Sequence, residues 1–217
     1  MGVAKYQTDG DPRTSGPGFG VVLHPDTLDV PHRWREPRVI FVNSMSDLFH
    51  PEVPTDFIHR VFDVMVATPR HTFQILTKRS ARLAALAPEL PWPSNIWMGV
   101  SVETRSYGFR VEHLRRVPAS VRFVSAEPLL GSLAGLPLHG VDWLIAGGES
   151  GSKARSVDPT WIRELRDACL AESVPFFFKQ WGGVRAKSGG RILDGRTWDG
   201  MPSATVRWGQ EVGAARQ

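Results

Sequence analysis

NIWMGVSVETRSYGFRVEHLRRVPASVRFVSAEP, residues 95–128, contains the unit that decides the fold of this chain. Its two ends, 95–103 and 120–128, are apolar runs without polar alternation, which is typical of strands buried on both faces. Between them, residues 106–118 form a basic helical segment that stops at Pro118. A strand, a helix and a second strand in this order predict a parallel pair, because parallel strands need a crossover connection.

The same order of strand and helix extends in both directions from this unit. Successive strand centres lie about 21 to 34 residues apart, which leaves room for a helix in each connection, with 129–140 as the doubtful case. The predicted strands are 38–43, 71–79, 95–103, 120–128, 141–150 and 174–183, and the predicted helices are 54–69, 80–90, 106–118 and 158–174. Such a chain is α/β, either an open doubly wound sheet or a barrel. We expect a partial (β/α) barrel of about six parallel strands, because polar residues gather at the strand ends.

The domain organisation follows from where this repeating order begins and ends. Residues 1–37 are polar and broken by glycine and proline, so they are expected to be irregular. Residues 38–185 form the partial barrel, and 186–217 are expected to be an irregular tail that wraps it. With 217 residues, 41% hydrophobic and 22% charged, the chain has the composition of an ordinary globular protein.

Composition also excludes several protein classes. The chain has no apolar run near the roughly 20 residues that span a bilayer, and its N-terminus has no apolar signal region, so a cytoplasmic protein is expected. Cys169 is the single cysteine, which rules out an internal disulfide framework and a metal site built from several cysteines. His50, His59 and His71 lack the spacing of metal ligands, so no metal site is predicted. The formal net charge is +4, and 21 of the 26 basic residues are arginine.

Polar side chains follow nearly every predicted strand. Ligands bind at the carboxyl ends of the strands in both α/β architectures, so these residues are the candidate ligand-binding set. The candidates are Ser44, Asp47, Lys78, Glu103, Glu127, Gly147, Gly148, Glu149, Ser150, Lys179 and Trp181. If the strand ends converge, they bring together three carboxylates (Glu103, Glu127 and Glu149) and two lysines (Lys78 and Lys179). Such a site suits a ligand that carries both a carboxylate and an amine, or a phosphate. The alternative is that these charges pair with one another and only solvate the rim.

Two of the strand ends are also rich in glycine. AGGESG (146–151) could hold a phosphate with its backbone N–H groups, but it does not fit a known phosphate-binding pattern, and Glu149 would repel the anion. The glycines could instead allow a sharp turn close to a ligand. Trp181 lies beside Lys179 and two glycines, which makes it the one tryptophan with a plausible binding role.

Six of these motifs, FVNSMSDLFHPEVP, QILTKR, MGVSVE, AEPLLG, IAGGESG and PFFFKQWGG, resemble a family of bacteriophage and prophage proteins. This is the gp thirty-seven/gp sixty-eight family, whose members have no assigned function. The resemblance runs from about Thr8 to about Trp198. Members usually carry three clustered cysteines in an N-terminal segment and are regarded as radical-SAM-like (β/α) barrels. The resemblance therefore implies a [4Fe–4S] cluster and S-adenosylmethionine as the cofactors of a full-length relative, with the strand-end residues holding the cofactor and substrate.

This chain departs from that pattern at the cysteines. Ala126 stands where relatives often have a cysteine, and Cys169 alone cannot hold a conventional cluster. The first barrel strand and the cluster loop are therefore expected to be missing. Three explanations are open. The true start lies upstream of Met1, the chain is a remnant that keeps the barrel without the chemistry, or a separate polypeptide supplies the cysteines.

A second function class needs no catalysis. The predicted helix 106–118 and its flank carry four arginines, Arg105, Arg110, Arg115 and Arg116. These could bind nucleic acid or a host protein. Whether this chain is an enzyme, and which substrate it would take, is left open by the sequence.

Overall fold

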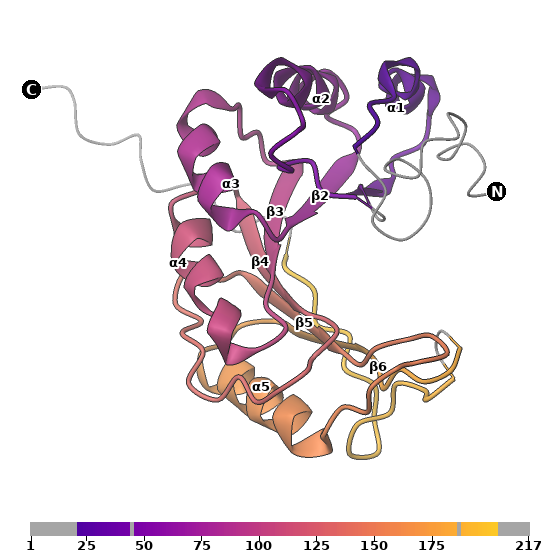
Figure 1. The fold of residues 1–217 in the computed structure, drawn as a ribbon, viewed down its shortest axis with the longest axis vertical. Coiled ribbons are helices and arrows are strands. Elements are labelled where there is room, and N and C mark those ends of the chain that lie inside the picture. Colours follow the sequence, from indigo (N-terminus) through magenta and orange to yellow (C-terminus); the bar gives the residue numbers. More distant parts are fainter. Residues whose placement is uncertain (1–20, 44–45, 186–187, 204–217) are drawn as a thin grey trace, which may run out of the picture.

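A computed structural model describes residues 21–43, 46–185 and 188–203. Its six strands form one sheet in the order β1-β2-β3-β4-β5-β6, and every neighbouring pair is parallel. The strands are β1 (Val39–Val42), β2 (Thr72–Thr77), β3 (Ile96–Ser101), β4 (Val121–Ala126), β5 (Trp143–Gly147) and β6 (Phe176–Gln180). The sheet curls into half a barrel (Figure 1), which confirms the predicted partial (β/α) barrel.

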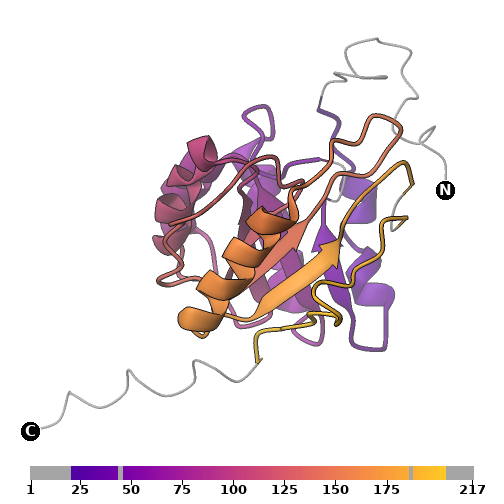
Figure 2. The same cartoon turned by 90° about the horizontal axis from the view of Figure 1, so that it is seen from below.

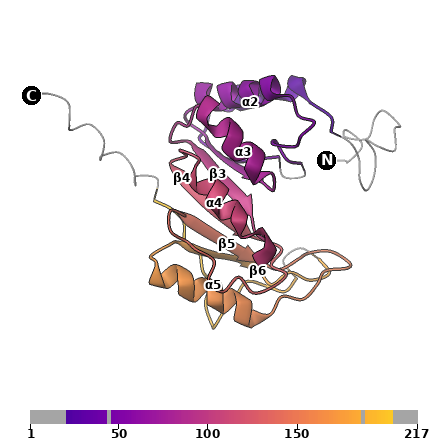
Figure 3. The ribbon, with the colours of Figure 1, turned by 60° about the vertical axis from the view of Figure 1, so that its left-hand side comes forward.

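The helices lie on the outer, convex face of the sheet, as the side view shows (Figure 3). In the part of the chain that the structure describes, they are α1 (Val30–Arg33), α2 (Thr55–Ala67), α3 (Ser80–Leu86), α4 (Phe109–Arg115) and α5 (Pro159–Ala171). Short 3₁₀ turns occupy Pro25–Thr27, Ala87–Glu89 and Arg105–Tyr107. The connection from β4 to β5 contains no helix, in agreement with the doubtful case in the sequence.

Local sequence explains the ends of the two long helices. α2 follows Pro54 and buries Ile58, Phe62 and Met65, which recur at helical spacing along one side. α5 begins after Asp158, whose carboxylate accepts a hydrogen bond from the Thr160 N–H at 2.8 Å. This bond satisfies one of the free N–H groups at the helix start.

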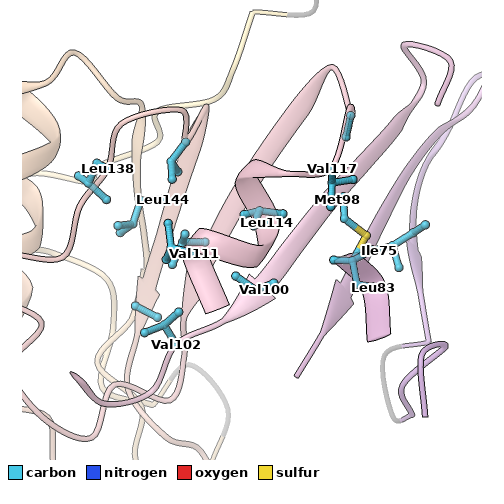
Figure 4. Close-up of a cluster of buried hydrophobic side chains, with 14 of the residues drawn as sticks. Ile75, Leu83, Met98, Val100, Val102, Val111, Leu114, Val117, Leu138 and Leu144 are labelled. Atoms are coloured by element: carbon cyan, nitrogen blue, oxygen red, sulfur yellow. The ribbon is translucent and has the colours of Figure 1, made fainter. Parts of the chain in front are cut away.

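The main hydrophobic core lies between the sheet and the helices. Val111 and Leu114 of α4 pack toward the strands, and Leu83 of α3 lies beside Met98 and Ile75 (Figure 4). All five side chains are almost fully buried. Because successive residues of a strand point to opposite faces, the alternate strand positions form a second, inner face of the half barrel.

The inner face of the half barrel carries a buried, mainly aromatic cluster, which we call the floor. Trp97, Val121, Phe123 and Trp143 are buried there, and Phe177 packs against them. The Phe123 ring lies directly over Gly99, where a Cβ atom would come within 2.3 Å of the ring. A glycine is therefore required at this position of β3 if the Phe123 ring is to keep its place.

The segments outside the barrel repeat are partly ordered by contacts with it. Arg70 donates hydrogen bonds to three carbonyl groups of residues 31–34, which fixes the α1 segment on the barrel. This segment was expected to be irregular, and α1 is a single helical turn within it. At the other end of the chain, residues 188–203 run beside β6 (Figure 2). Phe177 and Asp199 form an antiparallel bridge, and the Trp143 indole N–H donates to the Gly200 carbonyl at 2.8 Å.

No helix in the described ranges has the length and apolar character needed to cross a membrane.

Candidate functional site

The candidate residues that the structure describes lie at the carboxyl edge of the sheet, at or just beyond the last residue of a strand. Asp47 follows β1, Lys78 follows β2, and Glu103 follows β3. Glu127 follows β4, and Lys179 is the second-last residue of β6. Ser44 falls outside the described residues. Because adjacent parallel strands end side by side, the sheet topology brings these charges to one rim.

Glu103 is the most buried carboxylate of the rim, with only 6% of its side chain exposed. Two cations contact it. The Lys78 ammonium forms an ion pair with Oε1, and the Arg110 guanidinium donates to Oε2 at 3.0 Å. Arg110 is itself 8% exposed, and it also donates to the Ser101 carbonyl at 2.8 Å. Its guanidinium stacks on the Tyr107 ring at 4.1 Å. Lys78, in contrast, is half exposed.

Glu127 forms the second ion pair of the rim. Lys179 Nζ lies 2.8 Å from Glu127 Oε2, and the Gln180 amide lies 3.4 Å from Oε1. The Gln180 amide also donates to the Ser150 hydroxyl at 2.7 Å, so it links the ends of β4, β5 and β6. The Glu127 side chain is 18% exposed and that of Lys179 is 53% exposed. As at Glu103, an exposed lysine covers a more buried carboxylate.

Glu149 differs from Glu103 and Glu127 because its cationic partner is an arginine and not a lysine. Its partner is Arg155, in the same loop, which donates two side-chain hydrogen bonds at 2.8 Å and one backbone hydrogen bond at 3.0 Å. These hydrogen bonds lower the pKa of Glu149 to about 2. The carboxylate is therefore ionised at neutral pH and already has a cation.

Asp47 ties the ends of β1 and β2 together. Oδ1 accepts hydrogen bonds from the Thr77 hydroxyl at 2.6 Å and the Phe49 N–H at 3.0 Å, and Oδ2 accepts from the Lys78 N–H at 3.0 Å. Three donors to one carboxylate indicate an anchoring role, in which Asp47 fixes the backbone that carries Lys78.

The glycines of AGGESG serve close backbone packing. A Cβ atom at Gly148 would lie 2.0 Å from the Trp181 carbonyl oxygen, and one at Gly182 would lie 2.1 Å from that of Glu149. The loops after β5 and β6 continue the strand pairing, since Gly148 N donates to Gln180 O and Gly183 N donates to Glu149 O. These glycines therefore allow the loops after β5 and β6 to pack closely against each other.

Trp181 is half-buried and packs on the core. Its ring lies 4.7 Å from that of Phe178 in an edge-on arrangement, and its N–H donates to the Ile192 carbonyl at 2.8 Å. The C-terminal segment therefore supplies the hydrogen-bond acceptor for the indole N–H of Trp181. Trp97 and Trp143, in contrast, are buried in the inner aromatic cluster.

The arginines of the helix 106–118 and its flank are largely engaged within the protein. Arg110 is buried against Glu103. Arg105 donates to the Ala134 carbonyl, and Arg115 binds Glu112 at 2.6 Å and the His139 carbonyl at 2.7 Å. A pocket of about 200 Å³ lies nearby, between Arg105, Phe109 and the loop 133–137, and no strand-end candidate lines it.

Comparison with known proteins gives a family without an activity. A family model described as "Protein of unknown function (DUF5131)" matches residues 4–202. The chain belongs to the DUF5131 family. No match was found among curated proteins or among solved structures. The DUF5131 match covers the entire half barrel, so the paired charges of the rim lie within the family domain.

In this DUF5131 chain, no group of three or more His, Cys, Asp or Glu side chains within the described ranges could hold a metal ion. Cys169 is fully buried in α5, on the helix side of the sheet. Burial, with a smaller contribution from Glu172, raises the pKa of its thiol to about 12. Its place in the core leaves it unable to act as a ligand at the rim.

Three residues of this DUF5131 rim are absent from the predicted ligand-binding set: Thr77, Arg110 and Gln180. Thr77 and Gln180 stand at predicted strand ends beside Lys78 and Lys179, so the sequence located them without selecting them. Arg110 gave no such signal, because it reaches Glu103 from α4 and was counted among the surface arginines of that helix.

Proposed function

We propose that this protein binds a small molecule carrying both an anionic and a cationic group at the carboxyl edge of the half barrel. One observation carries the proposal. Two half-exposed lysines, Lys78 and Lys179, each cover a more buried carboxylate, Glu103 or Glu127. Each lysine is about half exposed, so water can solvate its ammonium group when it leaves the carboxylate. A charged ligand that takes its place can then pair with the lysine or with the carboxylate.

S-adenosylmethionine is the ligand that we propose within this class. It carries a carboxylate, an ammonium and a sulfonium, so its charges match the mixed charges of the rim. The resemblance to radical-SAM-like phage and prophage proteins, with their (β/α) barrels, supports the same choice. The family match gives no activity of its own.

A cysteine-ligated [4Fe–4S] cluster does not fit the residues of this chain. A cluster needs several thiolates, and the sequence contains one cysteine, buried in α5 with a raised thiol pKa. Ala126, at the position where relatives often have a cysteine, is buried on the helix-covered face. We therefore derive no cleavage step, and the proposal is binding alone.

Isothermal titration of the protein with S-adenosylmethionine tests the proposal. Glu127→Gln removes one charged partner, and losing a hydrogen bond to a charged group costs about 1.5–3 kcal/mol, so Kd should rise about 10- to 100-fold. Glu112→Gln is the matched control, because Glu112 is an exposed glutamate of α4 whose partner is Arg115. Wild-type protein that shows no saturable binding, or equal affinity in Glu127→Gln and wild type, would contradict the proposal.

The alternative function is binding of nucleic acid through the arginines of α4 and its flank, and it predicts a different outcome for the Glu127→Gln variant. It predicts DNA affinity that falls steeply with salt and survives Glu127→Gln. The internal hydrogen bonds of Arg105, Arg110 and Arg115 favour ligand binding at the rim over this alternative.

A further inference from the structure

The two ion pairs of the rim differ in one respect that bears on the ligand. We infer that the ligand binds in one orientation, with its anionic group at Lys78 and its cationic group at Glu127. This inference rests on the proposed function and adds a polarity to it. The two pairs lie on different strands, Lys78 and Glu103 at β2 and β3, and Glu127 and Lys179 at β4 and β6.

At β2 and β3, two cations share one carboxylate. Glu103 contacts both Lys78 and the buried Arg110, and Arg110 is held in place by the Ser101 carbonyl and the Tyr107 ring. If Lys78 moves away, Glu103 keeps a charged partner at 3.0 Å. Because a buried carboxylate then remains paired, Lys78 can leave at low cost and bind an anion. This half of the rim therefore offers a positive charge.

At β4 and β6, one cation contacts one carboxylate. Apart from Lys179, Glu127 contacts the Gln180 amide, at a long 3.4 Å, and that amide also donates to Ser150. Gly147 lies against the same carboxylate, since a Cβ there would be 3.4 Å from Glu127 Cδ and Oε1. If Lys179 moves away, Glu127 has no other cation among the residues that the structure describes. The exchange is favourable when the ligand brings one, so this half offers a negative charge.

The other rim carboxylates do not alter this assignment. Asp47 is occupied by three donors from Phe49, Thr77 and Lys78. Glu149 is neutralised by Arg155 through three hydrogen bonds. Among the residues that the structure describes, no lysine side chain pairs with either carboxylate, so neither is poised to exchange.

The spacing of the strands limits the ligand further. Lys78 and Glu127 follow β2 and β4, which are two strand spacings or about 10 Å apart. Because the Lys78 ammonium reaches Glu103 beyond β3, the charged groups are separated by about 5–10 Å. The ligand class is thus a small molecule whose carboxylate and cation lie about that far apart. In S-adenosylmethionine, the carboxylate would meet Lys78, and the sulfonium, further along the side chain than the α-ammonium, would meet Glu127.

Binding of three related compounds to the full chain tests the orientation. S-adenosylmethionine has both charges, its decarboxylated form lacks the carboxylate, and 5′-methylthioadenosine lacks the amino-acid part and the sulfonium charge. Lys78→Met should raise Kd for S-adenosylmethionine about tenfold and leave the decarboxylated form within about twofold. Glu127→Gln should raise Kd about 10- to 100-fold for both of these compounds and leave methylthioadenosine within about twofold.

A second measurement needs no ligand. Lys179→Met leaves Glu127 without a cation and should lower the melting temperature by about 3–6 °C, whereas Lys78→Met should lower it by about 2 °C or less. Lys153→Met, a lysine outside both pairs, serves as the control.

The outcomes separate the two proposals. If S-adenosylmethionine binds but Lys78→Met affects all three compounds equally, the orientation is overturned and ligand binding stands. If wild-type protein binds none of the compounds, the proposed function is contradicted. The orientation then falls with it. The melting temperatures test the premise of the orientation separately: a larger loss in Lys179→Met supports the asymmetry of the two ion pairs, and an equal or reversed order overturns the orientation even if S-adenosylmethionine binds.

Discussion

The floor and the rim of the half barrel are built on the same strands but are held by different interactions. At the floor, Phe123 is fully buried between aromatic neighbours and rests on Gly99. The rim begins at the carboxyl end of the same strand, where Glu127 follows β4. There the side chains form ion pairs, and Lys78 and Lys179 are half exposed. Close-packed interiors resist small changes in volume, while half-exposed lysine side chains can change position more easily. The comparison teaches that the half barrel joins a rigid base to a more adaptable rim.

The largest effect should come from removing the ring at the floor. Phe123→Ala deletes a fully buried aromatic side chain and should lower the free energy of unfolding by about 3–5 kcal/mol. Urea denaturation measures this loss. Phe109→Ala is the matched control, because Phe109 is 54% exposed and its removal should cost less than about 1 kcal/mol. Similar losses in the two variants would show that the floor is not the rigid region.

Part of the rim should be as sensitive as the floor. Gly182 has a φ of +87°, and a Cβ there would meet the Glu149 carbonyl oxygen at 2.1 Å. Gly182→Ala should therefore cost about 2–4 kcal/mol, from backbone strain and from separating the loops after β5 and β6. Gly190→Ala is the control, since it has a φ of +70° but open space around it. Urea denaturation of both variants separates the steric cost from the backbone cost.

A single methyl group at the floor tests how tightly it is packed. Gly99→Ala places a Cβ within 2.3 Å of the Phe123 ring and should cost about 1–3 kcal/mol. Gly131→Ala, where no atom lies within 4 Å of the new Cβ, should be nearly neutral. Combining Gly99→Ala with Phe123→Leu should recover part of the loss. Strict additivity in this double-mutant cycle would mean that the ring and the glycine do not interact.

The smallest effect should come from the exposed pair of Glu149 and Arg155. The pKa of Glu149 is lowered from 4.5 to about 2, so its ionised form stabilises the fold above pH 4.5, and this contribution disappears as pH falls toward 2. The difference in melting temperature between wild type and Glu149→Gln should therefore shrink from pH 5 to pH 2. Melting curves in low and high salt check this, because salt should shrink the difference at pH 5 as well. A difference that is constant across this range would contradict it.

The strands could be predicted because they depend on local sequence. The apolar runs at 38–43 and 120–128 became β1 and β4 with their ends trimmed, since periodicity indicates a buried strand without reference to the rest of the chain. Pro69 and Pro118 correctly marked where α2 and the segment around α4 end. The α1 turn was missed, because it is fixed by Arg70 from a distant part of the chain.

The partners at the rim could not be predicted in the same way. Topology explains why Lys78 and Glu103 lie together, since β2 and β3 are neighbours. Topology does not predict that Glu149 pairs with Arg155 in its own loop, because that pairing depends on the loop conformation. Nor does it predict that Arg110 contacts Glu103 from a helix. The sequence therefore locates the rim but not its charge arrangement.

The C-terminal segment beside β6 makes the two edges of the sheet unequal. Residues 198–200 hydrogen bond to Phe176 and Phe178, so the backbone of that edge is already in use. Within the ranges that the structure describes, β1 has a strand neighbour on one side only, and Val39 and Phe41 are exposed along it. The sheet edge at β6 is therefore covered by the C-terminal segment, whereas the edge at β1 is open in the described part of the chain. A further strand, from this chain or another, can pair with β1 and extend the half barrel on that side only.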